Sequence, residues 1–260
     1  MNVKELFELK DRVILVTGGA GNYGRCIAEG LAEADATVII ASRNIDHLKK
    51  LAEEFQTRHL DVHPMQVDQG DHASVMQLKK QILQEFGKLD GFVNNAVSRP
   101  MKNYHAPIEQ FAESMQVNAT GMMDILREMA DIILENKNGG SIINISSMMG
   151  MFGPDVSNYE GTEMNKDLPP DYFFHNAGLI NLTRFMAKQF AGKNLRVNCI
   201  SPGGLLNNQP PRFLENYTKK VPLRRMANND DIKGLVVLLS SKAGEYINGE
   251  NILMDGGLNA

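Results

Sequence analysis

The chain has 260 residues, of which 43% are hydrophobic and 22% charged, so it can bury a substantial core as one α/β domain. A net charge of -4 at pH 7 excludes the strongly basic surface that a nucleic-acid partner requires. The N-terminus, MNVKELFELK, is too charged for a signal peptide, and no apolar run of about 18 residues could span a membrane. We therefore expect a cytoplasmic protein that binds neither nucleic acid nor membrane.

A buried strand, a glycine-rich turn and a helix are predicted near the N-terminus. Residues 13–16 (VILV) are apolar, TGGAGNYG follows at 17–24, and from Arg25 onward Ile27 and Leu31 recur at helical spacing. Glycines let the backbone approach a pyrophosphate, and a helix N-terminus offers N–H groups to the anion. The stretch is a candidate phosphate cradle; the alternative is an ordinary tight connection.

The end of the second predicted strand bears on the choice of dinucleotide. Residues 37–41 (TVIIA) form that strand, and Ser42 and Arg43 follow it. In dinucleotide folds a carboxylate here holds the adenosine ribose, whereas a basic side chain accommodates a 2′-phosphate. Because no carboxylate repels a phosphate and the guanidinium matches one, NADP(H) is favoured over NAD(H). The alternative is that Arg43 is a solvated surface arginine.

Strands and helices alternate along the rest of the chain. Strands are predicted at 65–69, 89–93, 141–145, 196–200 and 251–254, and helices at 44–56, 106–135, 172–192 and 230–241. An acidic loop or lid at 151–171, which includes Lys166 and Asp167, and an irregular polar segment at 205–226 interrupt the pattern. Polar residues follow most strands, at the sheet edge where ligands bind in open parallel sheets. Asn118 lies in mid-helix, so it either faces solvent or its amide has a function.

Seven motifs, in this order, resemble the short-chain dehydrogenase/reductase family over essentially the whole chain. They are TGGAGNYG (17–24), NNA (94–96), VNATG around Asn118, ISS (145–147), Tyr172, RVNCISPGG (196–204) and NGENILMDGG (248–257). The resemblance implies a single Rossmann-type domain over residues 1–260, with a doubly wound, seven-stranded parallel sheet in three α/β/α layers. It also implies a homotetramer or homodimer.

The activity that the resemblance implies is hydride transfer between a nicotinamide and a secondary alcohol or ketone. A free tyrosine titrates at about 10, and in the family a lysine one helical turn after the tyrosine lowers that value. Carried over, Tyr172 is the acid/base, Ser147 polarises the substrate oxygen, Asn118 is the helix asparagine and Asn176 occupies the lysine position. The implied cofactor-binding residues are Gly18, Asn22, Tyr23, Ser42, Arg43, Asp68, Asn95, Ala96, Tyr172, Asn176, Pro202 and Gly203.

Departures from the family pattern leave two hypotheses open. Asn176 has no charge, so the electrostatic help to the tyrosine is lost, and His175 is expected to point elsewhere on the helix. Asn22 replaces the middle glycine of the turn, although asparagine tolerates left-handed backbone angles; Val97 replaces the glycine after Asn-Asn-Ala. An active oxidoreductase is favoured because Asn118, Ser147 and Tyr172 are retained. The alternative is a non-catalytic protein that keeps the fold, with or without the nucleotide, as a binding or scaffold module, and Asn22 and Asn176 favour it.

The substrate is expected to be polar. The 205–226 segment would close over it and carries Asn207, Asn208, Gln209, Arg212, Arg224 and Arg225, which do not suit a steroid pocket. SPGGLLNNQ and the long insert are similar to gluconate-dehydrogenase-like and surface-sugar-pathway members of the family. A sugar, polyol or sugar acid is favoured, with a 3-oxoacyl thioester as the alternative, and the arginines are equally compatible with a solvated rim. The histidines and cysteines show no ligand spacing, so no metal is expected.

Overall fold

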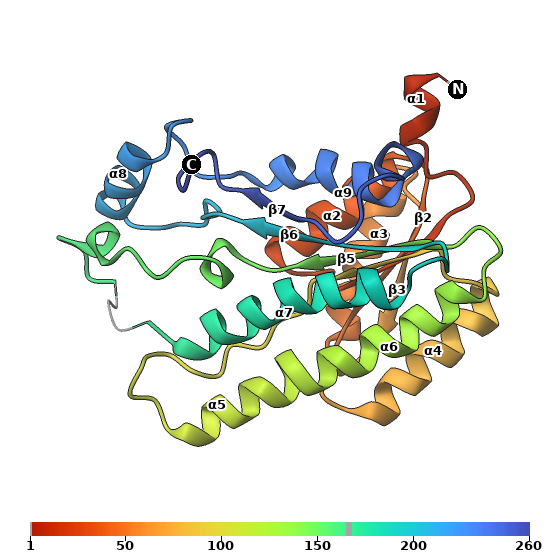
Figure 1. Cartoon of the computed structure of the whole chain (residues 1–260), viewed down its shortest axis with the longest axis horizontal. Helices are drawn as coiled ribbons and strands as arrows, with labels where there is room; N and C mark the ends of the chain where they lie inside the picture. The colour runs from red at the N-terminus through yellow and green to blue at the C-terminus, as the bar shows by residue number, and fades with distance from the viewer. Residues whose placement is uncertain (1, 165–167) are drawn as a thin grey trace.

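A parallel sheet in the order β3-β2-β1-β4-β5-β6-β7 forms the centre of the molecule (Figure 1). The computed structural model describes residues 2–164 and 168–260, so Lys166 and Asp167 of the predicted insert lie outside the described residues. The strands are β1 Val13–Thr17, β2 Thr37–Ser42, β3 Val62–Gln66, β4 Gly91–Asn94, β5 Gly140–Ile145, β6 Leu195–Pro202 and β7 Asn251–Met254. This arrangement confirms the predicted seven-stranded, doubly wound Rossmann-type sheet.

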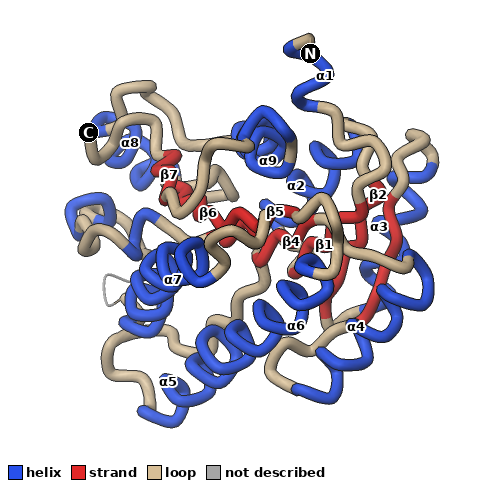
Figure 2. The backbone as a smooth tube through the Cα atoms, turned by 45° about the vertical axis from the view of Figure 1, so that its right-hand side comes forward, coloured by secondary structure: helices blue, strands red, loops and turns tan. Residues whose placement is uncertain are grey.

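Helices cover both faces of the sheet, as Figure 2 shows for α2 and α9 on one side and α6 and α7 on the other. The helices are α1 Val3–Phe7, α2 Asn22–Glu33, α3 Ile45–Gln56, α4 His72–Phe86, α5 Ile108–Met115, α6 Met122–Leu134, α7 Pro170–Gln189, α8 Pro211–Lys220 and α9 Lys233–Ser240. Val13 and Leu15 pack toward α4 and α6, whereas Ile14 and Val16 pack toward α2 and α9. A strand buried on both faces needs an apolar residue at every position, which explains the VILV run. Within the described residues, no helix combines the length and the apolar character that crossing a bilayer requires.

Strand β3 begins and ends three residues earlier than predicted. It spans Val62–Gln66 instead of residues 65–69, and its register pairs Val38 with Val62 and Ser42 with Gln66. His63 and Pro64 interrupt the apolar pattern, which hides the start of the strand in the sequence. Proline is tolerated there because β3 is an edge strand.

The long helix predicted over 106–135 is divided into α5 and α6 by a π-helical turn over Gln116–Gly121. Gly121 packs so closely on the neighbouring chain that a Cβ there would lie 2.1 Å from the carbonyl oxygen of Gln69. The wider turn carries Asn118, whose side chain is buried, so the solvent-facing alternative for this residue is wrong. Such turns are frequent at functional sites.

The 205–226 segment is not wholly irregular, because it contains helix α8. Pro211 occupies the first turn, where proline is favoured, and Phe213 and Tyr217 are buried one turn apart. The Phe213 ring meets that of Tyr159, with centroids 5.3 Å apart, and Tyr159 belongs to the 151–171 insert. The insert and α8 therefore share a small hydrophobic cluster beyond the sheet, at the left of Figure 1.

Candidate active site

A cleft of about 510 Å³ lies at the carboxyl ends of β1, β4, β5 and β6. Sheet order reverses between β1 and β4, and open α/β sheets bind ligands at this point. The predicted site residues that line it are Gly18, Asn22, Tyr23, Ser42, Asn95, Ala96, Asn118, Ser147, Tyr172, Asn176, Pro202 and Gly203. Two others, Arg43 and Asp68, line a neighbouring hollow of about 280 Å³.

The glycine-rich turn has the shape of a phosphate cradle. Gly18 adopts a φ of +65°, and a Cβ there would come within 2.9 Å of the Asn95 amide nitrogen. That amide donates to the carbonyl oxygen of Thr17 at 3.0 Å, which ties the turn to the end of β4. Helix α2 begins here with no capping side chain, so its first N–H groups can bind an anion. The buried Tyr23 hydroxyl has no hydrogen-bond partner among the described residues, which also suits a bound ligand.

The asparagine in the turn needs no left-handed backbone. Asn22 is the first residue of α2, with Gly21 as the N-cap, and its backbone is helical. Gly24 is the position that requires a close approach, because a Cβ there would lie 2.0 Å from the carbonyl oxygen of Gly18. Asn22 therefore places no strain on the backbone of the turn.

Ser147 and Asn118 enter the cleft from different elements. Ser147 follows β5, and its Oγ accepts a hydrogen bond from the Met149 N–H at 3.2 Å, which leaves its O–H able to donate. Asn118 accepts from the Ser98 N–H at 2.8 Å and donates to the Ser98 carbonyl oxygen at 2.7 Å. Its amide therefore holds the chain that follows β4.

Asn176 is held by its own helix. Its side-chain Nδ2 donates to the backbone carbonyl oxygen of Tyr172 at 2.8 Å. The backbone carbonyl oxygen of Asn176 accepts from the Ser146 hydroxyl at 3.1 Å. The side chain is 3% exposed and lines the cleft. It fills the position one turn after the tyrosine without supplying a charge.

His175 lines the same cleft as Tyr172, so the expectation that it points elsewhere is wrong. The two rings meet edge to face, with centroids 5.4 Å apart. Tyr172 and His175 are three residues apart, and residues at this spacing lie side by side on a helix. The rotation of about 100° between His175 and Asn176 therefore does not separate the His175 ring from Tyr172. Burial lowers the pKa of His175 to about 4; Asp171 acts in the opposite direction and Arg99 in the same one. The imidazole is therefore neutral at pH 7.

Arg99 is a cleft residue that sequence reasoning missed. Its Nη2 lies 3.3 Å from the Tyr172 hydroxyl oxygen, and its Cζ lies 4.5 Å from the centroid of that ring. The only signal in the sequence was its position three residues after the Asn-Asn-Ala motif. Contact between residues 73 apart in the chain depends on how the fold brings the chain after β4 to the first turn of α7.

The arginines of the 205–226 segment contact protein groups at the rim. Arg212 pairs with Glu215 at 2.9 Å, Arg225 pairs with Asp231, and Arg224 donates to the carbonyl oxygen of Lys219. Of the polar residues predicted to close over a substrate, Asn207 and Gln209 line the cleft. The contacts therefore support the rim alternative for the arginines.

Comparison with known proteins identifies several that are similar over almost the whole chain. A family model described as enoyl-(acyl carrier protein) reductase matches residues 19–259. The post-translational flagellin modification protein A of Campylobacter coli is 30% identical, with 96% of this chain and 98% of that protein covered. The 3-oxoacyl-[acyl-carrier-protein] reductase FabG of Thermotoga maritima is 29% identical, with the same coverage.

Solved structures agree with the fold. A short-chain type dehydrogenase/reductase from Mycobacterium marinum has a TM-score of 0.88 at 28% identity, with both chains fully covered. A gluconate 5-dehydrogenase from Burkholderia cenocepacia, solved with NADP and tartrate, has a TM-score of 0.86 at 25% identity, with 99% of this chain and 98% of that chain covered.

Proposed function

The chain belongs to the short-chain dehydrogenase/reductase family and is an oxidoreductase, and we propose that it uses NADP(H) to interconvert polar secondary alcohols and ketones. The observation that carries the proposal is the meeting of Asn118, Ser147 and Tyr172 in one cleft with the glycine cradle. A protein that served only as a scaffold would have no use for this combination of side chains. The non-catalytic alternative rests on Asn176 and on Asn22, whose backbone is helical but whose side chain replaces a glycine of the family pattern.

The cleft residues suit a dinucleotide. Gly18, the first turn of α2 and Tyr23 would hold its phosphates, and Asn95 and Ala96 would lie beside the middle of the molecule. Arg43, exposed after β2, would neutralise a 2′-phosphate where other members place a carboxylate for the ribose. When bound, the nicotinamide supplies or accepts the hydride at the substrate carbon.

Proton transfer in the proposed reaction belongs to Tyr172. During reduction a new C–H bond forms, the C=O π bond breaks, and the Tyr172 hydroxyl gives its proton to the substrate oxygen; solvent then restores that proton. Oxidation runs through the same steps in reverse. Ser147 donates a hydrogen bond to the same oxygen and so polarises the carbonyl group.

A sugar, polyol or sugar acid is the proposed substrate class. Asn207 and Gln209 line the cleft and can bind hydroxyl groups. The similarity to a gluconate 5-dehydrogenase supports this class, and the similarity to FabG supports a 3-oxoacyl thioester as the second candidate.

Calorimetric titration with NADPH and NADH, followed by turnover of a panel of carbonyl compounds, tests the proposal. We expect NADPH to bind at least about tenfold more tightly than NADH, a difference of about 1.4 kcal/mol. Arg43→Met should remove most of that preference without lowering the affinity for NADH. Tyr172→Phe should bind the cofactor as the parent does but lose turnover. Failure of both nucleotides to bind would favour the scaffold alternative.

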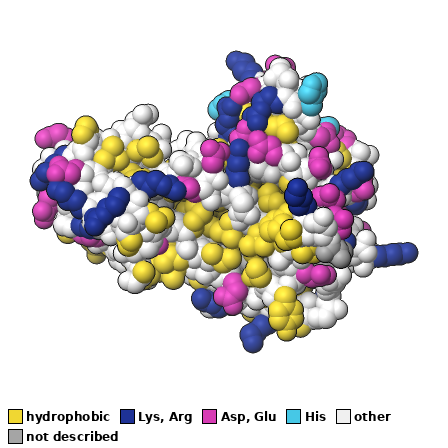
Figure 3. All heavy atoms as spheres, turned by 90° about the horizontal axis from the view of Figure 1, so that it is seen from above, with side chains coloured by type: hydrophobic (Ala, Val, Ile, Leu, Met, Phe, Trp, Pro, Cys, Tyr) yellow, Lys and Arg dark blue, Asp and Glu magenta, His cyan; other side chains and the backbone are white. Residues whose placement is uncertain are grey.

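We also infer that the chain forms a homo-oligomer. Figure 3 shows hydrophobic side chains gathered between charged groups on the face seen from above, and β7 is only partly buried along its length. Exposed apolar patches of this kind mark protein interfaces. Sedimentation as a monomer at micromolar concentration would contradict the inference.

A further inference from the structure

We propose that the guanidinium of Arg99 replaces the missing active-site cation beside Tyr172. The proposal rests on the function proposed above, in which Tyr172 is the acid/base. It assigns to the chain after β4 an electrostatic role that the helix position 176 cannot supply, because Asn176 is neutral and donates to its own helix.

The geometry places the positive charge of Arg99 beside the hydroxyl group of Tyr172. The Arg99 Nη2 lies 3.3 Å from the Tyr172 hydroxyl oxygen, and the guanidinium carbon lies 4.5 Å from the ring centroid. An arginine in this position can donate to the phenolate oxygen and also interact with the face of the ring. Both contacts favour the form of Tyr172 that has lost its proton.

No other described side chain in the cleft carries a fixed charge. Among the described residues that line it, Arg99 is the only Lys, Arg, Asp or Glu. His175 faces the same ring but is neutral at pH 7, and Tyr23 contributes a second phenol. Asp171 is buried in the first turn of α7, next to Tyr172 in sequence. Its negative charge would disfavour the phenolate form of Tyr172, and the charge of Arg99 would have to oppose that repulsion.

The segment that carries Arg99 is held in place by side chains. Asn118 binds both the N–H and the carbonyl oxygen of Ser98, and its amide also donates to the Ser114 hydroxyl at 3.0 Å. On the other side of Ser98, the Lys102 ammonium donates to the carbonyl oxygen of Arg99 at 2.8 Å. These bonds restrict the backbone from which the guanidinium reaches Tyr172, so less freedom is lost when the contact forms.

Arg99 would act through its charge and not as a proton carrier. A guanidinium stays protonated at every pH at which the protein is folded, so it neither gives nor takes the proton in the reaction. Tyr172 still exchanges its proton with the substrate oxygen and then with solvent. Through its charge Arg99 would stabilise the phenolate of Tyr172, which is the role that the resemblance gives to the lysine in other members of the family.

The first test needs neither cofactor nor substrate. The near-ultraviolet absorbance of tyrosinate is followed against pH, and the Tyr172 contribution is taken as the difference between a protein and its Tyr172→Phe variant. In the Arg99→Met background we expect this contribution to appear at a pH about one unit higher. This shift corresponds to about tenfold less phenolate at a given pH. Arg99→Lys should stay close to the parent. Arg127→Met, the same change of charge on the exposed side of α6, is the matched control.

The second test is kinetic and uses the Asn176→Lys variant, which restores a cation one turn after the tyrosine. Arg99→Met should lower kcat at pH 7 about tenfold, with KM nearly unchanged and with the activity recovered at alkaline pH. In the Asn176→Lys background the same substitution should cost much less, because the two cations serve one group.

The outcomes separate the two proposals. If Arg99→Met leaves the Tyr172 absorbance titration unchanged, or raises KM for acidic substrates while kcat and the pH profile stay the same, Arg99 does not act on Tyr172 and the inference is overturned. If neither the parent nor Asn176→Lys binds NADPH or reduces any carbonyl compound, the proposed function fails. The absorbance titration then still decides whether Arg99 controls the ionisation of Tyr172.

Discussion

His175 is held in a neutral form by its surroundings, and that affects the protein as well as its site. The side chain is 7% exposed, and its Nε2 has no hydrogen-bond partner among the described residues. Because burial lowers its pKa to about 4, the unfolded chain binds a proton that the folded chain does not between pH 4 and about 6.5. Stability is therefore fully present above about pH 6.5 and falls as the pH drops through this window.

Replacing this histidine should flatten the acid dependence of stability. In the parent, His175 contributes up to about 1.4 kcal/mol per pH unit to the slope of unfolding free energy between pH 4 and 6.5. His175→Gln should remove that contribution, as measured by denaturant unfolding at several pH values. His72→Gln is a control of opposite sign, because a hydrogen bond to Asp124 raises the pKa of His72 and its contribution is lost as the pH rises. Equal slopes in the parent and His175→Gln would contradict the prediction.

At the scale of elements, Lys220 is the charged link between α8 and the 151–171 insert, beside Asn216, whose amide donates to the carbonyl oxygens of Asn158 and Glu160. The Lys220 ammonium, at the end of α8, contacts Asp155 at 2.6 Å and Asn158 at 2.7 Å, as well as the Ser157 hydroxyl. The hydrogen bond to Lys220 lowers the pKa of Asp155. The stability that this contact contributes is fully present above the unfolded aspartate pKa of about 3.9. It is lost as the pH falls through the lower pKa of Asp155 in the folded protein.

Lys220→Met should loosen the insert without unfolding the sheet. We expect faster protease cleavage within 151–171 and a several-fold higher KM. The global Tm should change little, because the insert and α8 pack in a small hydrophobic cluster outside the main core. Lys219→Met is the matched control, since Lys219 pairs at 2.6 Å with Glu215 of the same helix. Cleavage at equal rates in the two variants would show that Lys220 does not hold the insert.

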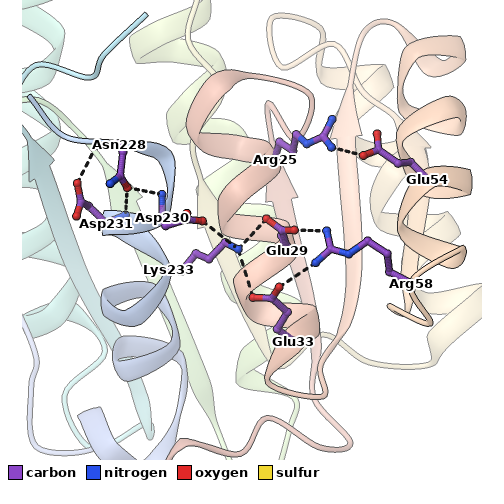
Figure 4. Close-up of polar contacts among 9 residues, drawn as sticks. All are labelled: Arg25, Glu29, Glu33, Glu54, Arg58, Asn228, Asp230, Asp231 and Lys233. Atoms are coloured by element: carbon purple, nitrogen blue, oxygen red, sulfur yellow. Dashed lines mark hydrogen bonds and ion pairs between the residues drawn. The ribbon is translucent and has the colours of Figure 1, made fainter.

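At the scale of the whole molecule, a charge network connects segments 200 residues apart in sequence (Figure 4). Lys233 of α9 lies 2.7 Å from Glu29 and 3.3 Å from Glu33, both on α2, and Arg58 after α3 contacts the same two carboxylates. Although burial acts in the opposite direction, hydrogen bonds to Lys233 and Arg58 lower the pKa of Glu29. Its contribution to stability is therefore present above about pH 4.3 and lost in acid.

Lys233→Met should destabilise the protein by about 1–3 kcal/mol, since it leaves the largely buried Glu29 carboxylate and the exposed Glu33 carboxylate with one partner fewer. For a chain of this size each kcal/mol corresponds to about 2–4 °C in Tm, which calorimetry would resolve. Arg25→Met is the control, because the Arg25–Glu54 pair is about half exposed on both sides and should contribute little. A Tm loss no larger than that of the control would mean that the network adds nothing to the fold.

The sequence determined the elements whose signals are local. Apolar runs bounded by glycine and polar residues located β1, β2, β5 and β7, and the order of motifs identified the family. The edge strand β3 was displaced in prediction because Pro64 breaks its pattern, and α8 was missed because its apolar face covers only the small cluster with Tyr159.

Only the tertiary structure decided what surrounds Tyr172. The sequence showed that the lysine position holds Asn176, but the charge of Arg99 and the buried neutral ring of His175 depend on side chains brought together from α7 and the chain after β4. Helical periodicity predicts which residues share one face of a helix, and the order of parallel strands predicts which strand ends meet at the same edge of the sheet. Neither specifies which side chains touch across that edge, because that contact is set by packing between distant segments.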